Sequence, residues 1–116
     1  MNVKVVFHID FDEEKFLLMT LGNCKNLLKE VDAKTSSICV LANGSSVKLL
    51  QKNTLAGYVS DIDALAIEGV KFFVCNNSLN KFDLTLEDML PVCETVKAGV
   101  LTLIELQNDQ FAYIKP

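Results

Sequence analysis

The feature that most constrains the fold is a regular alternation of short apolar runs with stretches of helical periodicity. Two runs, VKVVFHI (3–9) and VKFFVC (70–75), are almost entirely apolar and rich in valine and phenylalanine. This composition is typical of strands that are covered on both faces, as in a parallel sheet. A third such run is TSSICVLA (35–42), and two weaker ones are VCETV (92–96) and FAYIK (111–115). The sequence therefore predicts five strands.

Helical patterns fill the segments between these runs. After the first strand, Asp12 can cap a helix whose first turn carries Glu13 and Glu14, the charge that a helix dipole favours. Farther along, Ser60 can cap a helix that Gly69 terminates. Apolar residues at helical spacing predict the buried face of the first helix, formed by Leu17, Leu21, Cys24, Leu28 and Val31. Further helices are expected after NGSS (43–46), at TLEDML (85–90) before Pro91, and at 98–107.

Strands and helices in alternation predict an α/β fold. The expected architecture is a three-layer α/β/α sandwich around a five-stranded parallel sheet. A chain of 116 residues is long enough to bury one core, and no repeat or low-complexity linker divides it. Residues 1–116 are therefore expected to form a single domain.

Composition and charge restrict the partners of the chain. The net charge is -4 and no basic patch is visible, which argues against binding to nucleic acid. All eleven basic residues are lysines, so no arginine is present to bind phosphate or carboxylate with two parallel hydrogen bonds. Half of the residues, 50%, are hydrophobic, which predicts apolar surface that a homo-oligomer would cover.

The cysteines and the N-terminus indicate a reducing setting. No two of the four cysteines stand in a C-x-x-C pair, so neither a metal site nor a dithiol redox motif is expected. The start MNVKVVFHID lacks the pattern of a signal peptide, and no apolar run approaches the roughly 18 residues of a membrane span. A cytoplasmic protein with free thiols and no membrane association is expected. Without a glycine-rich phosphate loop, no cofactor is expected either.

Polar segments follow three of the predicted strands. They are HID (8–10), NGSS (43–46) and CNNS (75–78). Ligands of open parallel sheets bind beyond the carboxyl ends of the strands, where the next helix presents unpaired N–H groups. Because neighbouring strands end at the same edge, we expect at least some of these segments to lie together.

Cys75 is the candidate nucleophile at this edge. It is the last apolar residue before the polar turn, and Asn77 or Ser78 can cap the turn or short helix that follows. A thiol at a helix N-terminus has a lowered pKa and is more often the reactive thiolate. The alternative is that Cys75 only fills the core, since cysteine is also a small hydrophobic residue. Cys24 and Cys39 lie within apolar patterns and are expected to be packing residues.

His8, the only histidine, also has two interpretations. It is either a hydrogen-bonded core residue at the end of its strand or a partner that holds the Cys75 thiolate by an ion pair or a hydrogen bond. Asn43 and Gly44 form a tight turn after the second strand in either case. The residue pattern fits both interpretations.

The sequence also resembles a known family. The segments VKVVFHID, VLANGSSVKLL, EGVKFFVCNNSL and GVLTLIELQNDQFAYIKP are similar to small members of the DsrE/DsrF-like family, which includes sulfur-relay proteins. The distinctive element is a Gly-Val-Lys strand that runs from Gly69 into Cys75. The resemblance implies a five-stranded parallel sheet of the flavodoxin-like topology class and assembly into trimers or hexamers.

The resemblance further implies a role for the cysteine. In sulfur-relay members, the cysteine after the third strand accepts sulfane sulfur from a donor protein as a persulfide and passes it to an acceptor protein, and this position corresponds to Cys75. His8, Asn43, Gly44 and Asn77 are similar to positions around the cleft of short relatives and are possible site neighbours. Two functions therefore remain open, a sulfur carrier and a noncatalytic oligomeric module that binds a small anion or nucleotide at the strand ends.

Overall fold

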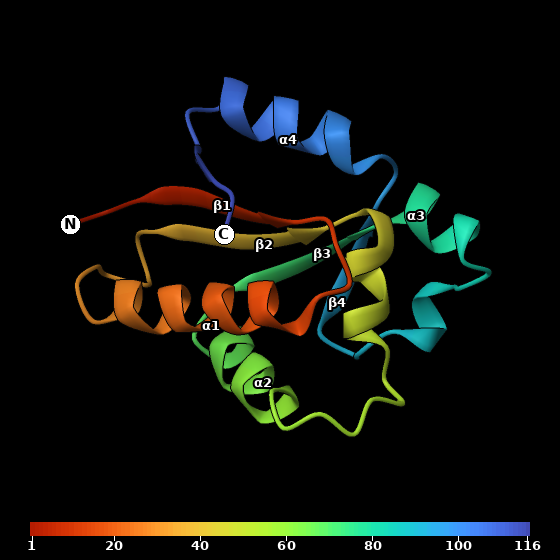
Figure 1. The fold of residues 1–116 in the computed structure, drawn as a ribbon. Helices are drawn as coiled ribbons and strands as arrows, with labels where there is room; N and C mark the ends of the chain where they lie inside the picture. Colours follow the sequence, from red (N-terminus) through yellow and green to blue (C-terminus); the bar gives the residue numbers. More distant parts are fainter.

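A computed structural model describes residues 1–116 and contains one five-stranded sheet (Figure 1). The strands are, in chain order, β1 (Lys4–Ile9), β2 (Ser37–Ala42), β3 (Lys71–Cys75), β4 (Cys93–Val96) and β5 (Ala112–Ile114). Their spatial order is β4-β3-β2-β1-β5, and every pair of neighbours is parallel. The five predicted strands and the parallel sheet are confirmed.

Helices cover both faces of this sheet. Figure 1 shows α1 (Glu14–Leu28) and α2 (Val59–Ile67) against one face and α4 (Gly99–Asn108) alone on the other. The short helix α3 (Asn76–Lys81) and two 3-10 helices, η1 (Gly44–Leu50) and η2 (Leu86–Asp88), follow strand ends or link them. The predicted three-layer α/β/α sandwich is therefore confirmed. It shares the layers of flavodoxin-like folds but not their strand order of 2-1-3-4-5.

The two faces bury unequal cores. The main core has 21 buried residues and lies on the side of α1 and α2, whereas the cluster under α4 has only four buried members, Val6, Cys39, Leu41 and Leu103. Phe73 packs against the smaller cluster, and side chains two residues apart on a strand point to the same face. Cys75 therefore points to the face that α4 covers.

Two predicted helix caps are wrong. The N-cap of α1 is Glu13, because Asp12 is held by η1: its backbone N–H donates to the Ser45 Oγ, and the Ser45 hydroxyl donates back to its carboxylate. Ser60 lies inside α2, after the N-cap Tyr58. The predicted end of α2 is confirmed, since Gly69 follows with a φ of 105°.

The predicted buried face of α1 is confirmed in its first half. Leu17, Leu21 and Cys24 are buried, and Leu28 is half-buried. The helix ends at Leu28, so Val31 lies beyond it and packs at the edge of the core. No helix of the structure has the length and apolar composition that crossing a bilayer requires.

Candidate functional site

The three polar segments after the strands meet at one edge of the sheet. β1, β2 and β3 are direct neighbours, and their register places Ile9 beside Ala42 and Ala42 beside Val74. Asn43 follows Ala42 directly, and Cys75 follows Val74, so these two residues lie beside each other at the ends of β2 and β3. The prediction that neighbouring strand ends bring these segments together is therefore confirmed.

Cys75 is the last residue of β3 and the N-cap of α3. The residue is only 5% exposed. Its Sγ accepts a hydrogen bond of 3.2 Å from the backbone N–H of Gly99, the first residue of α4. That N–H belongs to the first turn of a helix, where backbone donors have no partner within the helix. The thiol thus occupies a position where donors, not acceptors, face it.

These donors decide the pKa of the Cys75 thiol. Burial by itself raises the pKa, but the Ser78 hydroxyl and the backbone N–H groups of Gly99, Ser78 and Asn77 outweigh it and hold the pKa below its ordinary value. Asn77, an exposed residue, contributes through its backbone N–H. Each of these hydrogen bonds stabilises the thiolate more than the thiol, so the site favours the nucleophilic form.

Gly44 supports the Ser78 donor. The Gly44 N–H donates to the Ser78 Oγ at 2.8 Å, which leaves the hydroxyl proton of Ser78 free to donate to Cys75. Gly44 has a φ of 58°, and a β-carbon at this position would lie 2.7 Å from the backbone oxygen of Asp10. Only glycine fits this turn without displacing the loop after β1. The NGSS turn is therefore joined to Cys75 through one hydroxyl.

Gly99 allows α4 to approach the strand ends closely. A β-carbon on Gly99 would lie 3.3 Å from the Cys75 Cβ and 3.2 Å from the Asn43 Cβ. Gly99 is not among the site residues that the sequence predicts. Gly99 opens the helix that follows β4, and the end of β4 lies beside Cys75 in the register, an arrangement that the sequence alone does not specify.

His8 is a buried, fully hydrogen-bonded residue that is 8% exposed. Its Nδ1 lies 2.6 Å from the Tyr113 hydroxyl, and its Nε2 lies 2.7 Å from the Asn43 Oδ1. The core interpretation of His8 is therefore right, and the direct partnership with Cys75 is wrong. β2 separates the two strands, so Asn43 stands between His8 and Cys75.

The acidic residues after β1 are engaged elsewhere. The Asp10 carboxylate forms an ion pair of 2.9 Å with Lys115, which follows β5. Asp12 is bound to Ser45 of η1. Neither carboxylate forms a hydrogen bond with Cys75.

The other three cysteines lie in apolar surroundings. Burial raises the pKa of Cys24 to about 12, the pKa of Cys39 to about 11 and the pKa of Cys93 to about 12. All four cysteines are free and buried. Cys24 and Cys39 are packing residues, as predicted, and the core interpretation also describes Cys93.

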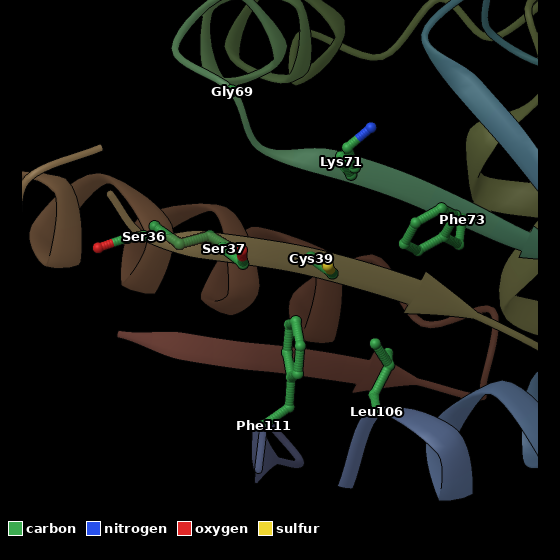
Figure 2. Close-up of a pocket in the computed structure, with 9 residues that line it drawn as sticks. Ser36, Ser37, Cys39, Gly69, Lys71, Phe73, Leu106 and Phe111 are labelled. Carbon is green, nitrogen blue, oxygen red and sulfur yellow. The ribbon is translucent and has the colours of Figure 1, made fainter. Parts of the chain in front are cut away.

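A separate cavity of about 290 Å³ lies on the α4 side of the sheet. Figure 2 shows the side chains of Phe73, Leu106 and Phe111 around Cys39, with Lys71 at the start of the β3 ribbon. None of the residues that line this cavity belongs to the Cys75 site. Its lining combines apolar side chains with Ser36, Ser37 and Lys71, and it lies beside the end of α4.

Comparison with known proteins gives the family. The DsrE/DsrF-like family model matches residues 4–116. A solved structure of a protein of unknown function from Methanobacterium thermoautotrophicum superposes with a TM-score of 0.89 at 32% sequence identity. The match covers 98% of this chain and 99% of that one. No match was found among curated proteins.

Proposed function

The chain belongs to the DsrE/DsrF-like family, and on this premise we propose that it is a sulfur-relay protein that carries sulfane sulfur as a persulfide on Cys75. Family membership supports the general role. The assignment to Cys75 rests on one observation, namely that backbone and hydroxyl donors surround this thiol and none of the other three. Of the four cysteines, it alone has a lowered pKa.

The proposed transfer consists of two exchange steps. The Cys75 thiolate attacks the outer sulfur of a donor persulfide, R–S–SH, which breaks the donor S–S bond and forms a Cys75 persulfide. The donor leaves as the thiolate R–S⁻. An acceptor thiolate then attacks the outer sulfur on Cys75, becomes a persulfide itself and returns Cys75 to the thiolate. Sulfur moves without net oxidation, so no cofactor takes part.

The absence of a second thiol at the site fits a carrier. No cysteine lies next to Cys75 in the sequence, and the other three are buried in apolar clusters. A neighbouring thiol would attack the persulfide and close a disulfide within the chain. The Cys75 persulfide is therefore not lost to a thiol of the same chain before an acceptor on another molecule attacks it.

The alternative function, a module that binds a small anion or nucleotide, needs a hollow at the strand ends. Small-molecule sites are concave and typically enclose about 300 to 1,000 Å³. The cavities of this chain are lined by other residues, and none includes Cys75 or Asn43. A sulfur carrier needs no such hollow, because only one attacking sulfur has to meet the thiol.

The proposal is tested by loading the chain with inorganic polysulfide and measuring its intact mass. The wild type should gain about 32 Da, one sulfur, reversibly. Cys75→Ser should gain none, whereas Cys93→Ser, the matched control, should gain as much as the wild type. Peptide mapping should locate the sulfur on Cys75.

A second step tests transfer. The loaded and desalted chain is mixed with a thiol acceptor, and the appearance of acceptor persulfide is measured. The proposal fails if Cys75→Ser takes up sulfur as well as the wild type, or if sulfur on Cys75 moves to no acceptor. The binding module would then be the better description.

We further propose that the chain forms a homo-oligomer, a trimer or hexamer, through the outer face of α4. Val100, Leu101 and Ile104 of this helix are at least half exposed, and they lie on the helix that covers the thinner core. Members of the family are often oligomeric. Burial of such a surface in an interface would remove apolar area from water.

Light scattering at micromolar concentration should give a mass that is a multiple of 12.9 kDa. The double substitution Leu101→Glu and Ile104→Glu should reduce it to one chain. Ile67→Glu on α2, equally apolar and more exposed, is the control and should leave the mass unchanged. A wild type of one chain would contradict the proposal.

A further inference from the structure

We infer that the Asn43 side-chain amide donates a hydrogen bond to the terminal sulfur of the Cys75 persulfide, and that His8 positions this amide. The inference rests on the proposed sulfur-relay function. It assigns one role to Asn43, which binds the terminal sulfur, and another to His8, which acts through Asn43.

The terminal sulfur requires a donor of its own. In a persulfide, the outer sulfur carries the negative charge and lies one S–S bond, about 2 Å, beyond Sγ. Gly99 and Ser78 donate to Sγ and stabilise the empty thiolate. Once sulfur is bound, the charge moves outward, away from these donors. A carrier that also holds the loaded form needs a polar hydrogen farther along the edge.

Asn43 is the neighbouring side chain that can supply it. A β-carbon on Gly99 would lie 3.2 Å from the Asn43 Cβ and 3.3 Å from the Cys75 Cβ. The Cβ atoms of Asn43 and Cys75 are therefore close neighbours. Asn43 follows β2, the strand between β1 and β3. Its side chain therefore has His8 on one side and Cys75 on the other.

The hydrogen bonds of His8 fix the orientation of this amide. The Asn43 Oδ1 can only accept, so the Nε2 of His8 must carry the proton of their 2.7 Å hydrogen bond. In the neutral ring, the Nδ1 then accepts from the Tyr113 hydroxyl at 2.6 Å. The Tyr113 hydroxyl can donate or accept, so it accommodates the tautomer that donates to Asn43 and holds the ring in place.

The amide nitrogen of Asn43 is left free by this arrangement. Oδ1 is engaged by His8 on β1, which leaves the two N–H groups of Nδ2 without a hydrogen-bond partner in the protein. No protein group accepts a hydrogen bond from it, yet no fully buried side-chain nitrogen or oxygen in the structure lacks a partner. The Nδ2 is therefore not completely buried, and its protons are free to donate to a bound anion.

The test separates loading from thiol reactivity. The chain is equilibrated with a fixed ratio of glutathione persulfide to glutathione, and the fraction of Cys75 that carries sulfur is measured by mass. Asn43→Ala should lower the loading constant about tenfold, the effect of one hydrogen bond to a charged group. Alkylation of the sulfur-free Cys75 by iodoacetamide should change less than about twofold, because Gly99 and Ser78 remain.

A matched pair of variants tests His8. In His8→Gln the amide nitrogen replaces Nε2 and can still donate to Asn43. In His8→Asn the side chain is one methylene shorter, so its amide does not reach Asn43. We expect His8→Gln to load within about threefold of the wild type and His8→Asn to load about as poorly as Asn43→Ala. Tyr113→Phe, which removes only the hydroxyl, should give an intermediate loss. Thermal unfolding confirms that each variant is folded.

The outcomes distinguish the inference from the function on which it rests. If the wild type loads Cys75 and Asn43→Ala loads equally well, the inference is wrong and the carrier function stands. If alkylation falls in parallel with loading, Asn43 has a general structural role and the inference is also wrong. If His8→Gln loads no better than His8→Asn, the positioning role of His8 is wrong. A wild type that never loads Cys75 overturns both proposals.

Discussion

Cys75 and Cys93 lie on adjacent strands and are equally buried, at 5% and 6% exposure, yet their thiols differ in acidity. Burial raises the pKa of Cys93 to about 12, while hydrogen bonds outweigh burial and lower the pKa of Cys75. Cys93 begins β4, and Cys75 ends β3. The difference shows that hydrogen-bond donors at the end of the strand, together with the shallower position of the Cys75 thiol, decide which thiol ionises.

The reason lies in the direction of a parallel sheet. At the carboxyl ends of the strands, the following helices begin, and their first N–H groups have no partners within the helix. Cys75 receives such groups from α3 and α4. Cys93 sits at the opposite end, in the main apolar core, where no donor offsets the loss of hydration. The same side chain is therefore more acidic than usual at one edge and a hydrophobic residue at the other.

Removing the turn that supports the Cys75 edge should have the largest effect. Gly44→Ala forces a φ of 58° on a residue with a β-carbon and places that carbon against the Asp10 carbonyl. We expect a loss of about 3 kcal/mol in the free energy of unfolding, together with slower alkylation of Cys75.

Denaturant unfolding measures this loss, and Gly22→Ala is the matched control. Gly22 lies inside α1 with no atom near its would-be β-carbon, so alanine should stabilise the chain by up to about 1 kcal/mol. Equal effects of the two substitutions would show that the Gly44 turn is not constrained.

Alkaline pH should expose the contrast between the two thiols. The folded pKa of Cys93 is about 12 and its ordinary value is 9.0, so the unfolded chain loses this proton first and stability falls as pH rises between them. By pH 11 the raised pKa of Cys93 should lower the free energy of unfolding by about 2 to 3 kcal/mol. Cys93→Ala should remove that part of the decline.

Cys75 should contribute with the opposite sign. Its folded pKa is below 9.0, so its stabilising contribution is present above 9.0 and is lost as pH falls through the folded pKa. The stability difference between the wild type and Cys75→Ala should therefore grow as pH rises toward 9.0. Urea unfolding at a series of pH values measures both slopes, and slopes of the same sign would contradict the contrast.

The strands could be predicted because both faces of the sheet are covered. The continuous apolar runs ending in Ile9 and Cys75 are too short to span a membrane, and their valine and phenylalanine content favours strands over helices. Asp12 and Ser60 failed as caps because capping depends on what else competes for the side chain, and Ser45 competes for Asp12. Such competition involves residues far apart in the sequence.

The sequence could predict only those site residues that stand directly after or at the end of a strand. Cys75 and Gly44 lie there, and the sequence indicates both. Gly99 contacts Cys75 only because β4 neighbours β3, and periodicity does not specify the order of strands. For the same reason the sequence could not show that β2 separates His8 from Cys75. Both errors come from the order of strands rather than from the chemistry of the residues.

The smallest expected effect concerns the single hydroxyl at the site. Ser78→Ala removes one donor to Cys75 and should raise its pKa and slow its alkylation at neutral pH about threefold to tenfold. Thiolate absorbance against pH measures the shift. Ser60→Ala, whose hydroxyl lies on α2 away from the site, should leave it unchanged. A reactivity of Ser78→Ala equal to the wild type would assign the low pKa to the backbone donors alone.

The most direct test of the account is the order in which the four thiols react. The native chain is treated with limiting iodoacetamide at neutral pH, and the alkylated cysteines are mapped by peptide mass. A thiol with a pKa of about 12 is a thiolate in only about one molecule in 100,000 at pH 7. Cys75 should therefore be alkylated at least about a thousandfold faster than Cys93 and before Cys24 and Cys39. Alkylation of any of these three first, or at the rate of Cys75, would contradict the account.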